Sequence, residues 1–348
     1  MEGQSSEELR TYDGAKRHQQ RLCGPFIAMS FNFVVSVAII LTNKLVLSEV
    51  GFKFPIYLTL IHYLTAWILL AIFKALSLLP VCPPKKMTPF SSLLALGFVM
   101  SFASGLANAS LRLNSVGFYQ MAKIAVTPTI VVAEFFLFRK LISYKRILSL
   151  LVVSIGVGVA TVSDVKFNLV GACIAIAWII PSAINKILWS NLQQQGNWTA
   201  LGLMWKTTPI TVTFLVGLVP LVDPPGALGF KWDLYSSTAI LISALLGFLL
   251  QWSGALALGA TSATSHVVLG QFKTCVVILC GSLLLSDRLG AVSLVGVAVA
   301  LAGMTVYTYV SMKEGKEQKN NQLKKNILPL SKSKTEIQGL NHQNGEKA

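Results

Sequence analysis

The sequence predicts an all-α polytopic membrane protein with ten transmembrane helices arranged as two inverted repeats of five. Of its 348 residues, 53% are hydrophobic and only 12% are charged, whereas soluble domains carry roughly 25% charged residues. The mean hydropathy is +0.64, and the apolar residues gather in ten runs long enough to approach or span a bilayer. A backbone in hydrocarbon must satisfy its own hydrogen bonds, which predicts helices rather than open strands.

The chain begins with a polar segment, residues 1–23, whose four acidic residues disfavour an organelle transit peptide. The apolar runs that follow cover residues 24–47, 55–79, 89–111, 115–138, 146–163, 167–189, 201–221, 236–258, 261–285 and 289–312. We expect them to form one ten-helix domain, 24–312, with repeats 24–163 and 167–312. The basic segment 313–348 is expected to be a disordered cytosolic tail.

The two halves resemble each other weakly in sequence. Residues 115–163 align with 262–310 at a shift of 147, which pairs Gly156 with Gly303. A shift that spans five helices, an odd number, inverts the second repeat in the membrane. Inverted repeats place a transporter's substrate site near the bilayer midplane, between the halves.

The formal charge of +15 does not indicate a nucleic-acid partner, because most of the excess lies in a few loops and in the C-terminal tail. Lys and Arg concentrate in the loops on the side of the two termini, which predicts cytosolic termini and contacts with membrane lipids. The five cysteines are odd in number and imply no disulfide framework.

Two lysines lie deep in predicted spans, Lys123 in 115–138 and Lys273 in 261–285. A charge at the bilayer centre costs about 3 kcal/mol on insertion scales and usually faces a pathway or a partner. Thr274 adds a hydroxyl beside Lys273, and an ammonium with a hydroxyl suits phosphate oxygens. Because the two lysines sit at similar depths in opposite halves, we expect them to hold one anion between them.

Neighbouring side chains extend this candidate site. His266 lies two helical turns before Lys273 and is suited to phosphate or sugar, or equally to bonding a neighbouring helix. Tyr119 and Gln120 are candidates for a base or sugar. Ser104 and Asn108 share a helix face and either line a polar cavity or join helices.

Other polar residues in the spans are interpreted more simply. His62, Tyr63 and Gln251 are expected mainly to pack. Lys44 and Lys186 lie near predicted span ends, where snorkelling to the interface is the default, although Asn185-Lys186 remains an outside candidate for the site.

Signatures of catalysis are absent from the sequence. It contains no Walker A loop, no dinucleotide-binding glycine motif and no metal-ligand cluster. We therefore expect a protein that is not an enzyme and needs no cofactor.

Three segments carry a resemblance to a known family: Asn43-Lys44, residues 115–123 and residues 269–275. They resemble the nucleotide-sugar transporter and triose-phosphate translocator family of the drug/metabolite transporter superfamily, most closely its plant Lys-Thr group of Golgi nucleotide-sugar transporters. The resemblance covers residues 24–312. It implies antiport of cytosolic nucleotide sugar against lumenal nucleoside monophosphate.

The resemblance also implies roles for single residues. In plastid phosphate translocators, substrate phosphate is held by a lysine matching Lys123 and by a histidine and a Lys-Arg pair. The histidine and lysine match His266 and Lys273, but Thr274 replaces the arginine. One positive charge is lost, which fits a diphosphate bridge better than a terminal phosphate.

The first hypothesis is a Golgi-membrane transporter that exchanges a UDP-sugar for UMP by alternating access. The alternatives are a sugar-phosphate/phosphate antiporter and a non-transporting scaffold whose basic tail recruits partners. The sequence does not identify the sugar or the base that is carried. It also leaves open whether the protein resides in the Golgi membrane or the endoplasmic reticulum, and whether it forms an oligomer such as a homodimer.

Overall fold

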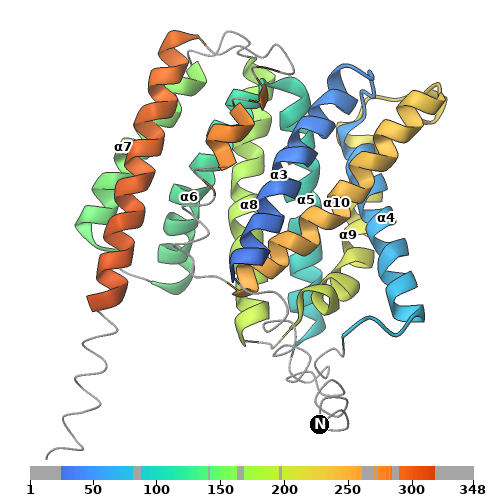
Figure 1. Cartoon of the computed structure of the whole chain (residues 1–348), viewed down its shortest axis with the longest axis horizontal. Helices are drawn as coiled ribbons and strands as arrows, with labels where there is room; N and C mark the ends of the chain where they lie inside the picture. Colours follow the sequence, from blue (N-terminus) through green and yellow to red (C-terminus); the bar gives the residue numbers. More distant parts are fainter. Residues whose placement is uncertain are drawn as a thin grey trace, which may run out of the picture.

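The protein is a bundle of long helices, seen in a computed structural model (Figure 1). The model describes residues 25–80, 88–139, 142–162, 168–195, 198–260, 270, 273–278, 280–281, 283 and 290–317. The elements are α3 (Pro25–Ser48), α4 (Pro55–Ala75), α5 (Phe90–Leu113), α6 (Val116–Phe138), α7 (Tyr144–Val162), α8 (Leu169–Gln195), α9 (Ala200–Val222), the short 3₁₀ helix η2 (Ala227–Gly229) and α10 (Leu234–Ala260). A last helix covers Ala291–Glu317.

Eight described helices are long and apolar enough to cross a membrane, so the chain is an all-helical, multi-pass membrane protein. The sequence predicted ten crossings. Helix α7 occupies the fifth predicted run but is not among the eight, and of the ninth run the model describes only 270, 273–278, 280–281 and 283, all helical. Ten crossings therefore remain a prediction.

Successive labelled helices run in alternating directions through the bundle (Figure 1). The start of α3 and the end of the last helix lie at the same end of the bundle, as an even number of crossings requires (Figure 1). The last helix continues five residues past the predicted run, where a disordered tail was expected. Its end is held by the Arg146 Nε–Glu314 Oε2 ion pair, 2.7 Å long, at the start of α7.

The antiparallel pair formed by α7 and the last helix depends on small residues. A Cβ added at Gly156 would collide with the backbone nitrogen of Ala300, and one at Gly296 would lie 2.5 Å from the backbone nitrogen of Ala160. Such close backbone approach is the usual role of small residues between membrane helices. The two contacts are reciprocal, since Gly156 admits the backbone of the last helix and Gly296 admits the backbone of α7.

The start of α4 is capped by a residue far away in the sequence. Its N-cap, Phe54, has no side-chain acceptor, but Asp223 accepts hydrogen bonds from the backbone amides of Ile56 (3.0 Å) and Tyr57 (2.7 Å). Burial raises the pKa of Asp223, although these two amides and Arg112 oppose the shift. Asp223 follows the last residue of α9 and thereby joins α9 to α4.

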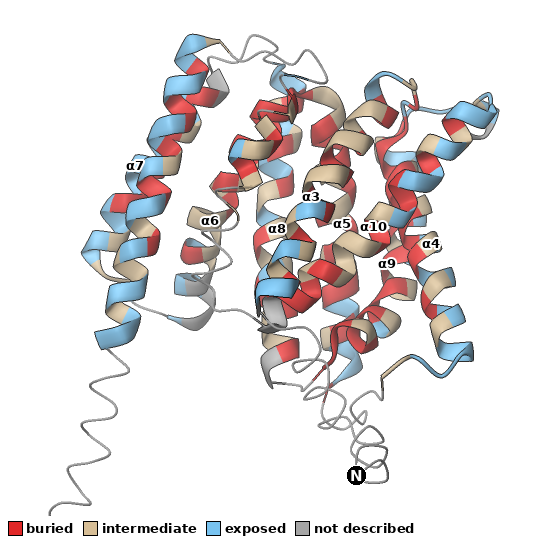
Figure 2. Ribbon diagram, in the orientation of Figure 1, coloured by how far each residue is buried: buried red, intermediate tan, exposed pale blue. Residues whose placement is uncertain are grey.

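Figure 2 shows the faces turned into the bundle as buried and many outward faces as exposed. Large apolar side chains lie outward, including Phe26 at 78% exposure and Leu221 at 79%. Inside, buried polar residues accompany the apolar clusters. An apolar exterior around a partly polar interior is the arrangement expected of a membrane transporter, since lipid covers the outer faces.

Candidate substrate site in a cavity between six helices

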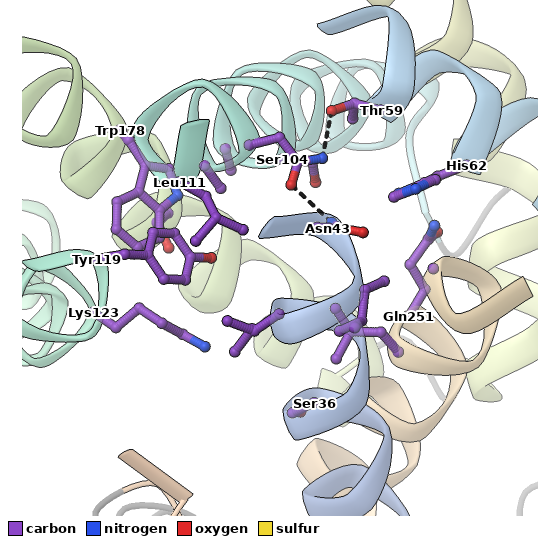
Figure 3. A pocket seen from close by; sticks show the side chains of 18 of the residues that line it. Ser36, Asn43, Thr59, His62, Ser104, Leu111, Tyr119, Lys123, Trp178 and Gln251 are labelled. Atoms are coloured by element: carbon purple, nitrogen blue, oxygen red, sulfur yellow. Dashed lines mark hydrogen bonds between the residues drawn. The ribbon is translucent and has the colours of Figure 1, made fainter. Parts of the chain in front are cut away.

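A cavity of about 230 Å³ lies between α3, α4, α5, α6, α8 and α10 (Figure 3). Its wall is uneven in chemistry. One side carries Lys123, Tyr119 and Trp178, while His62 and Gln251 lie across the cavity from them. The cavity therefore has a cationic, aromatic side and a neutral polar side.

The cationic side is built on α6. Lys123 points into the cavity, with its ammonium 5.6 Å from the centre of the Tyr119 ring one helical turn earlier. The Tyr119 ring stacks on Trp178 of α8, with ring centres 5.1 Å apart and planes inclined by 13°. A cation over an aromatic face is stabilised by the ring's quadrupole, so the stack orients both the ring and the lysine.

Lys273 adjoins this cavity from the ninth predicted span. Its ammonium donates to Asn32 Oδ1 at 2.8 Å and to Ser36 Oγ at 3.0 Å, both on α3; Ser36 lines the cavity. Asn32 and Ser36 are buried, at 3% and 2% exposure. The positive charge is thus held by two neutral oxygens, and no ion pair joins Lys273 to the described part of the chain.

A third lysine, Lys186 of α8, belongs to the same electrostatic environment. Lys123, Lys186 and Lys273 lie close enough to repel one another. Helix α8 extends to Gln195, six residues past the predicted run, so Lys186 lies deeper in its helix than the sequence indicated. Its side chain is exposed and is not part of the cavity wall, whereas Asn185, the residue before it, lines the cavity.

A chain of hydrogen bonds crosses the neutral side and joins four helices. Ser243 Oγ of α10 donates to Asn43 Oδ1 of α3 at 2.6 Å. Asn43 Nδ2 donates to Asn108 Oδ1 of α5 at 2.9 Å, and Asn108 Nδ2 donates to Thr59 Oγ1 of α4 at 2.9 Å. These amide groups supply one another's hydrogen-bond partners. The series of hydrogen bonds therefore holds the four helices together and fixes this side of the cavity wall.

His62 ends this chain. Its Nε2 lies 2.7 Å from Ser243 Oγ, and since Ser243 donates its hydrogen to Asn43, Nε2 is the donor. In the neutral ring Nδ1 is then an acceptor. A Cβ at Gly247 would lie 2.9 Å from Cγ of His62, so the glycine allows α10 to pass directly beside the ring.

The cavity brings together four of the residues predicted for the site, namely Ser104, Asn108, Tyr119 and Lys123. Ser104 also bonds the Tyr63 hydroxyl at 2.8 Å. The geometry places these side chains around one space, and their roles in binding stay predictions.

Two other predicted residues, Thr274 and Gln120, lie elsewhere. Thr274 is buried, and its hydroxyl donates to Gly270 O at 3.0 Å in its own helix. Gln120 is 1% exposed and does not line the cavity. His266 lies outside the described residues.

Sequence reasoning did not identify some residues that the structure places at the site. Asn32 and Ser36 share one face of α3, four residues apart, and a polar pair of this kind in an apolar run was an available signal. His62 was assigned to packing, but it lines the cavity. Among the described residues, no group of His, Cys, Asp or Glu is arranged to hold a metal ion.

Lys44 differs from its neighbours in the site. Its ammonium donates to Leu111 O at 3.0 Å and Asn114 O at 2.6 Å, the carbonyl groups at the end of α5. Cations are favourable at a helix C-terminus because the last carbonyls lack partners there. The lysine therefore joins α3 to α5 inside the bundle and does not snorkel.

Comparison with known proteins supplies the family. The Triose-phosphate Transporter family matches residues 26–308. The chain is 68% identical to "Nucleotide-sugar uncharacterized transporter 2" of Arabidopsis thaliana, over 94% of this chain and 83% of that protein. It is 59% identical to "Nucleotide-sugar uncharacterized transporter 1", over 87% and 78%, and 33% identical to "UDP-xylose transporter 2", over 82% and 81%, both of Arabidopsis thaliana. The multi-pass helical bundle, the lysines beside its internal cavity and this similarity over most of the chain agree, and the protein belongs to the Triose-phosphate Transporter family, a family of membrane transporters and not of enzymes.

Proposed function

We propose that the protein exchanges a nucleotide sugar, most simply a UDP-sugar, for a nucleoside monophosphate such as UMP. The observation that carries the proposal is the pair formed by Lys123 and Lys273, two lysines beside one cavity inside the membrane-spanning bundle that form no ion pair with the described residues. Each costs about 3 kcal/mol to place at that depth, and an anionic substrate offsets this cost. Relatives named for nucleotide sugars and UDP-xylose supply the substrate class.

The cavity fits part of such a substrate. Pockets for whole drug-sized ligands occupy about 300–1,000 Å³, more than the 230 Å³ found here. In our proposal the diphosphate lies between Lys123 and Lys273, while the nucleoside or sugar occupies the cavity. Tyr119, Ser104 and Asn108 contact it there, and Gln120, Thr274 and His266 complete the predicted set.

Alternating access is proposed to arise from two inverted repeats. The contacts between helices support this, because several pairs have a counterpart five helices away along the chain: α3 with α10 corresponds to α8 with α5, and α3 with α5 corresponds to α8 with α10. The reciprocal packing of Gly156 and Gly296 agrees. The halves would rock around the site, with ten crossings and both termini in the cytosol of a Golgi membrane.

Exchange, in place of net transport, follows from the charge of the site. An empty carrier must reorient with unneutralised lysines in a low-dielectric interior, which is slow. A bound anion neutralises the lysines during both halves of the transport cycle. Either substrate therefore speeds the reorientation of the carrier. The contacts from Lys273 to Asn32 and Ser36 show which neutral oxygens hold one of these charges.

The experiment is uptake into proteoliposomes preloaded with UMP or phosphate, with UDP-sugars, GDP-sugars and triose phosphates outside. We expect UMP-dependent uptake of a UDP-sugar and its loss in Lys273→Ala. The family's description favours one second candidate, triose-phosphate exchange against phosphate, and phosphate-driven uptake of triose phosphate would establish it instead.

A further inference from the structure

We infer that Asn185, Lys186 and Gln251 form a further part of the substrate site, in which the lysine contacts phosphate and the amide oxygens accept hydroxyl groups of the ligand's carbohydrate. The inference rests on the proposed function, since it assigns residues to the same transported nucleotide. None of the three was placed in the predicted binding set. The argument comes from comparing the two halves of the molecule.

The first and sixth helices of the chain carry the same short sequence. Asn43-Lys44 is followed by three apolar residues and Ser48, and Asn185-Lys186 is followed by three apolar residues and Ser190, at an offset of 142. At nearly the same offset, Gln251 of α10 corresponds to Asn108 of α5. The protein therefore contains two versions of one polar cluster, and each serves as a comparison for the other.

In the first half the cluster is closed. Asn43 and Asn108 are joined amide to amide at 2.9 Å. Lys44 is bound to the Leu111 and Asn114 carbonyls at the end of α5. The polar atoms named here are used within the protein, so this version of the cluster holds helices together.

In the second half the cluster is open. Asn185 and Gln251 both line the cavity, and Asn185 Oδ1 and Gln251 Oε1 are buried without a hydrogen-bond partner anywhere in the described chain. Lys186 likewise has no hydrogen bond or ion pair with any residue the structure describes. A buried polar atom without a partner costs free energy unless something supplies one, and two such amide oxygens on residues that line one cavity point to a ligand that supplies their partners there.

The unused groups define the ligand's chemistry. Two amide oxygens accept hydrogen bonds, so they require donors, and the hydroxyl groups of ribose or of a transferred sugar are donors. The ammonium of Lys186 requires acceptors, and its positive charge acts on both Lys123 and Lys273. A phosphorylated carbohydrate is the simplest molecule that offers both kinds of group.

The test measures ligand binding to purified full-length protein. We expect Lys186→Gln to weaken UMP binding by about 10- to 100-fold, the range for losing a hydrogen bond to a charged group. Gln251→Leu should weaken binding of UDP-xylose. If it weakens UMP equally, the hydroxyls are those of ribose, and if UMP is unaffected, they belong to the transferred sugar.

Lys44→Gln is the matched control, because Lys44 occupies the corresponding position but serves the end of α5. It should lower thermal stability and leave the affinity for UMP unchanged. Unchanged UMP affinity in Lys186→Gln, with a reduced exchange rate only, would overturn the inference and make the lysine part of the conformational change. Because binding is measured without transport, failure of wild-type exchange would count against the proposed function and leave the test of Lys186 intact.

Discussion

Replacing Asn32 by Asp should trap Lys273 and weaken anion binding. The Lys273 ammonium now lies 2.8 Å from the neutral oxygen Asn32 Oδ1. Aspartate has the same shape as asparagine but presents a carboxylate at that distance. The neutral contact becomes an ion pair that competes directly with the substrate for Lys273, and the net charge of the site falls by one.

The size of the effect follows from this distance. Two unit charges 2.8 Å apart attract by about 6 kcal/mol at an effective dielectric constant of 20. Desolvation of the new carboxylate costs several kcal/mol, so a surplus of about 2 kcal/mol remains. The substrate must overcome this surplus, which corresponds to a loss of affinity of about 30-fold.

The assay is the dependence of UMP-driven uptake on external UDP-sugar concentration in proteoliposomes. Asn32→Leu is the control, because it also removes the Asn32–Ser253 hydrogen bond, 3.2 Å long, without adding charge. We expect KM to rise about 30-fold in Asn32→Asp and much less in Asn32→Leu. A wild-type KM in correctly folded Asn32→Asp protein would refute the assignment of Lys273 to the substrate.

Three further predictions concern the scaffold and the aromatic wall. Asp223→Ala should lower the free energy of unfolding by about 1–2 kcal/mol, because the first turn of α4 loses its cap; an unchanged thermal transition would contradict this. Gly156→Val should force apart α7 and the last helix at the contact with Ala300, at a cost of about 1–3 kcal/mol, and thermal denaturation with size-exclusion chromatography would detect it. Trp178→Ala should raise KM about two- to tenfold through loss of the stack that positions Tyr119, and an unchanged KM would remove the aromatic pair from the site.

The sequence predicted the positions of most helices closely. The first three runs, 24–47, 55–79 and 89–111, correspond to helices at Pro25–Ser48, Pro55–Ala75 and Phe90–Leu113. Long apolar runs leave little freedom in a membrane, since only helices satisfy the backbone there. The polar end of α8 was missed because Asn and Gln are compatible with a helix that continues past the hydrocarbon.

Partners of the predicted residues were less accessible to sequence reasoning. Lys273 stood out as a charge in an apolar run, but Asn32 lies 241 residues away, and no spacing rule relates the two. The cap that Asp223 provides for α4 joins residues 167 positions apart, and sequence spacing does not predict it either. His62 was assigned to packing because a lone histidine gives no indication of the space beside it, and only the assembled bundle does.

The same limit explains the contrast between Lys44 and Lys186. Both follow an asparagine in an apolar run, and both received the same default interpretation. The structure separates them, since one lysine is bound by carbonyl groups and the other has no hydrogen bond or ion pair with the residues that the structure describes. Helix packing decides which of two similar motifs forms hydrogen bonds within the protein. The local sequence does not encode that packing.

The measurement that tests the central claim most directly compares UDP-sugar uptake into vesicles loaded with UMP and into empty vesicles, for the wild-type protein, Lys123→Gln and Lys273→Gln. The account predicts that internal UMP strongly stimulates uptake by the wild-type protein and that each substitution removes the stimulation, with folded protein verified by its thermal transition. Wild-type stimulation that survives both substitutions would contradict the claim that these two lysines hold the transported anion.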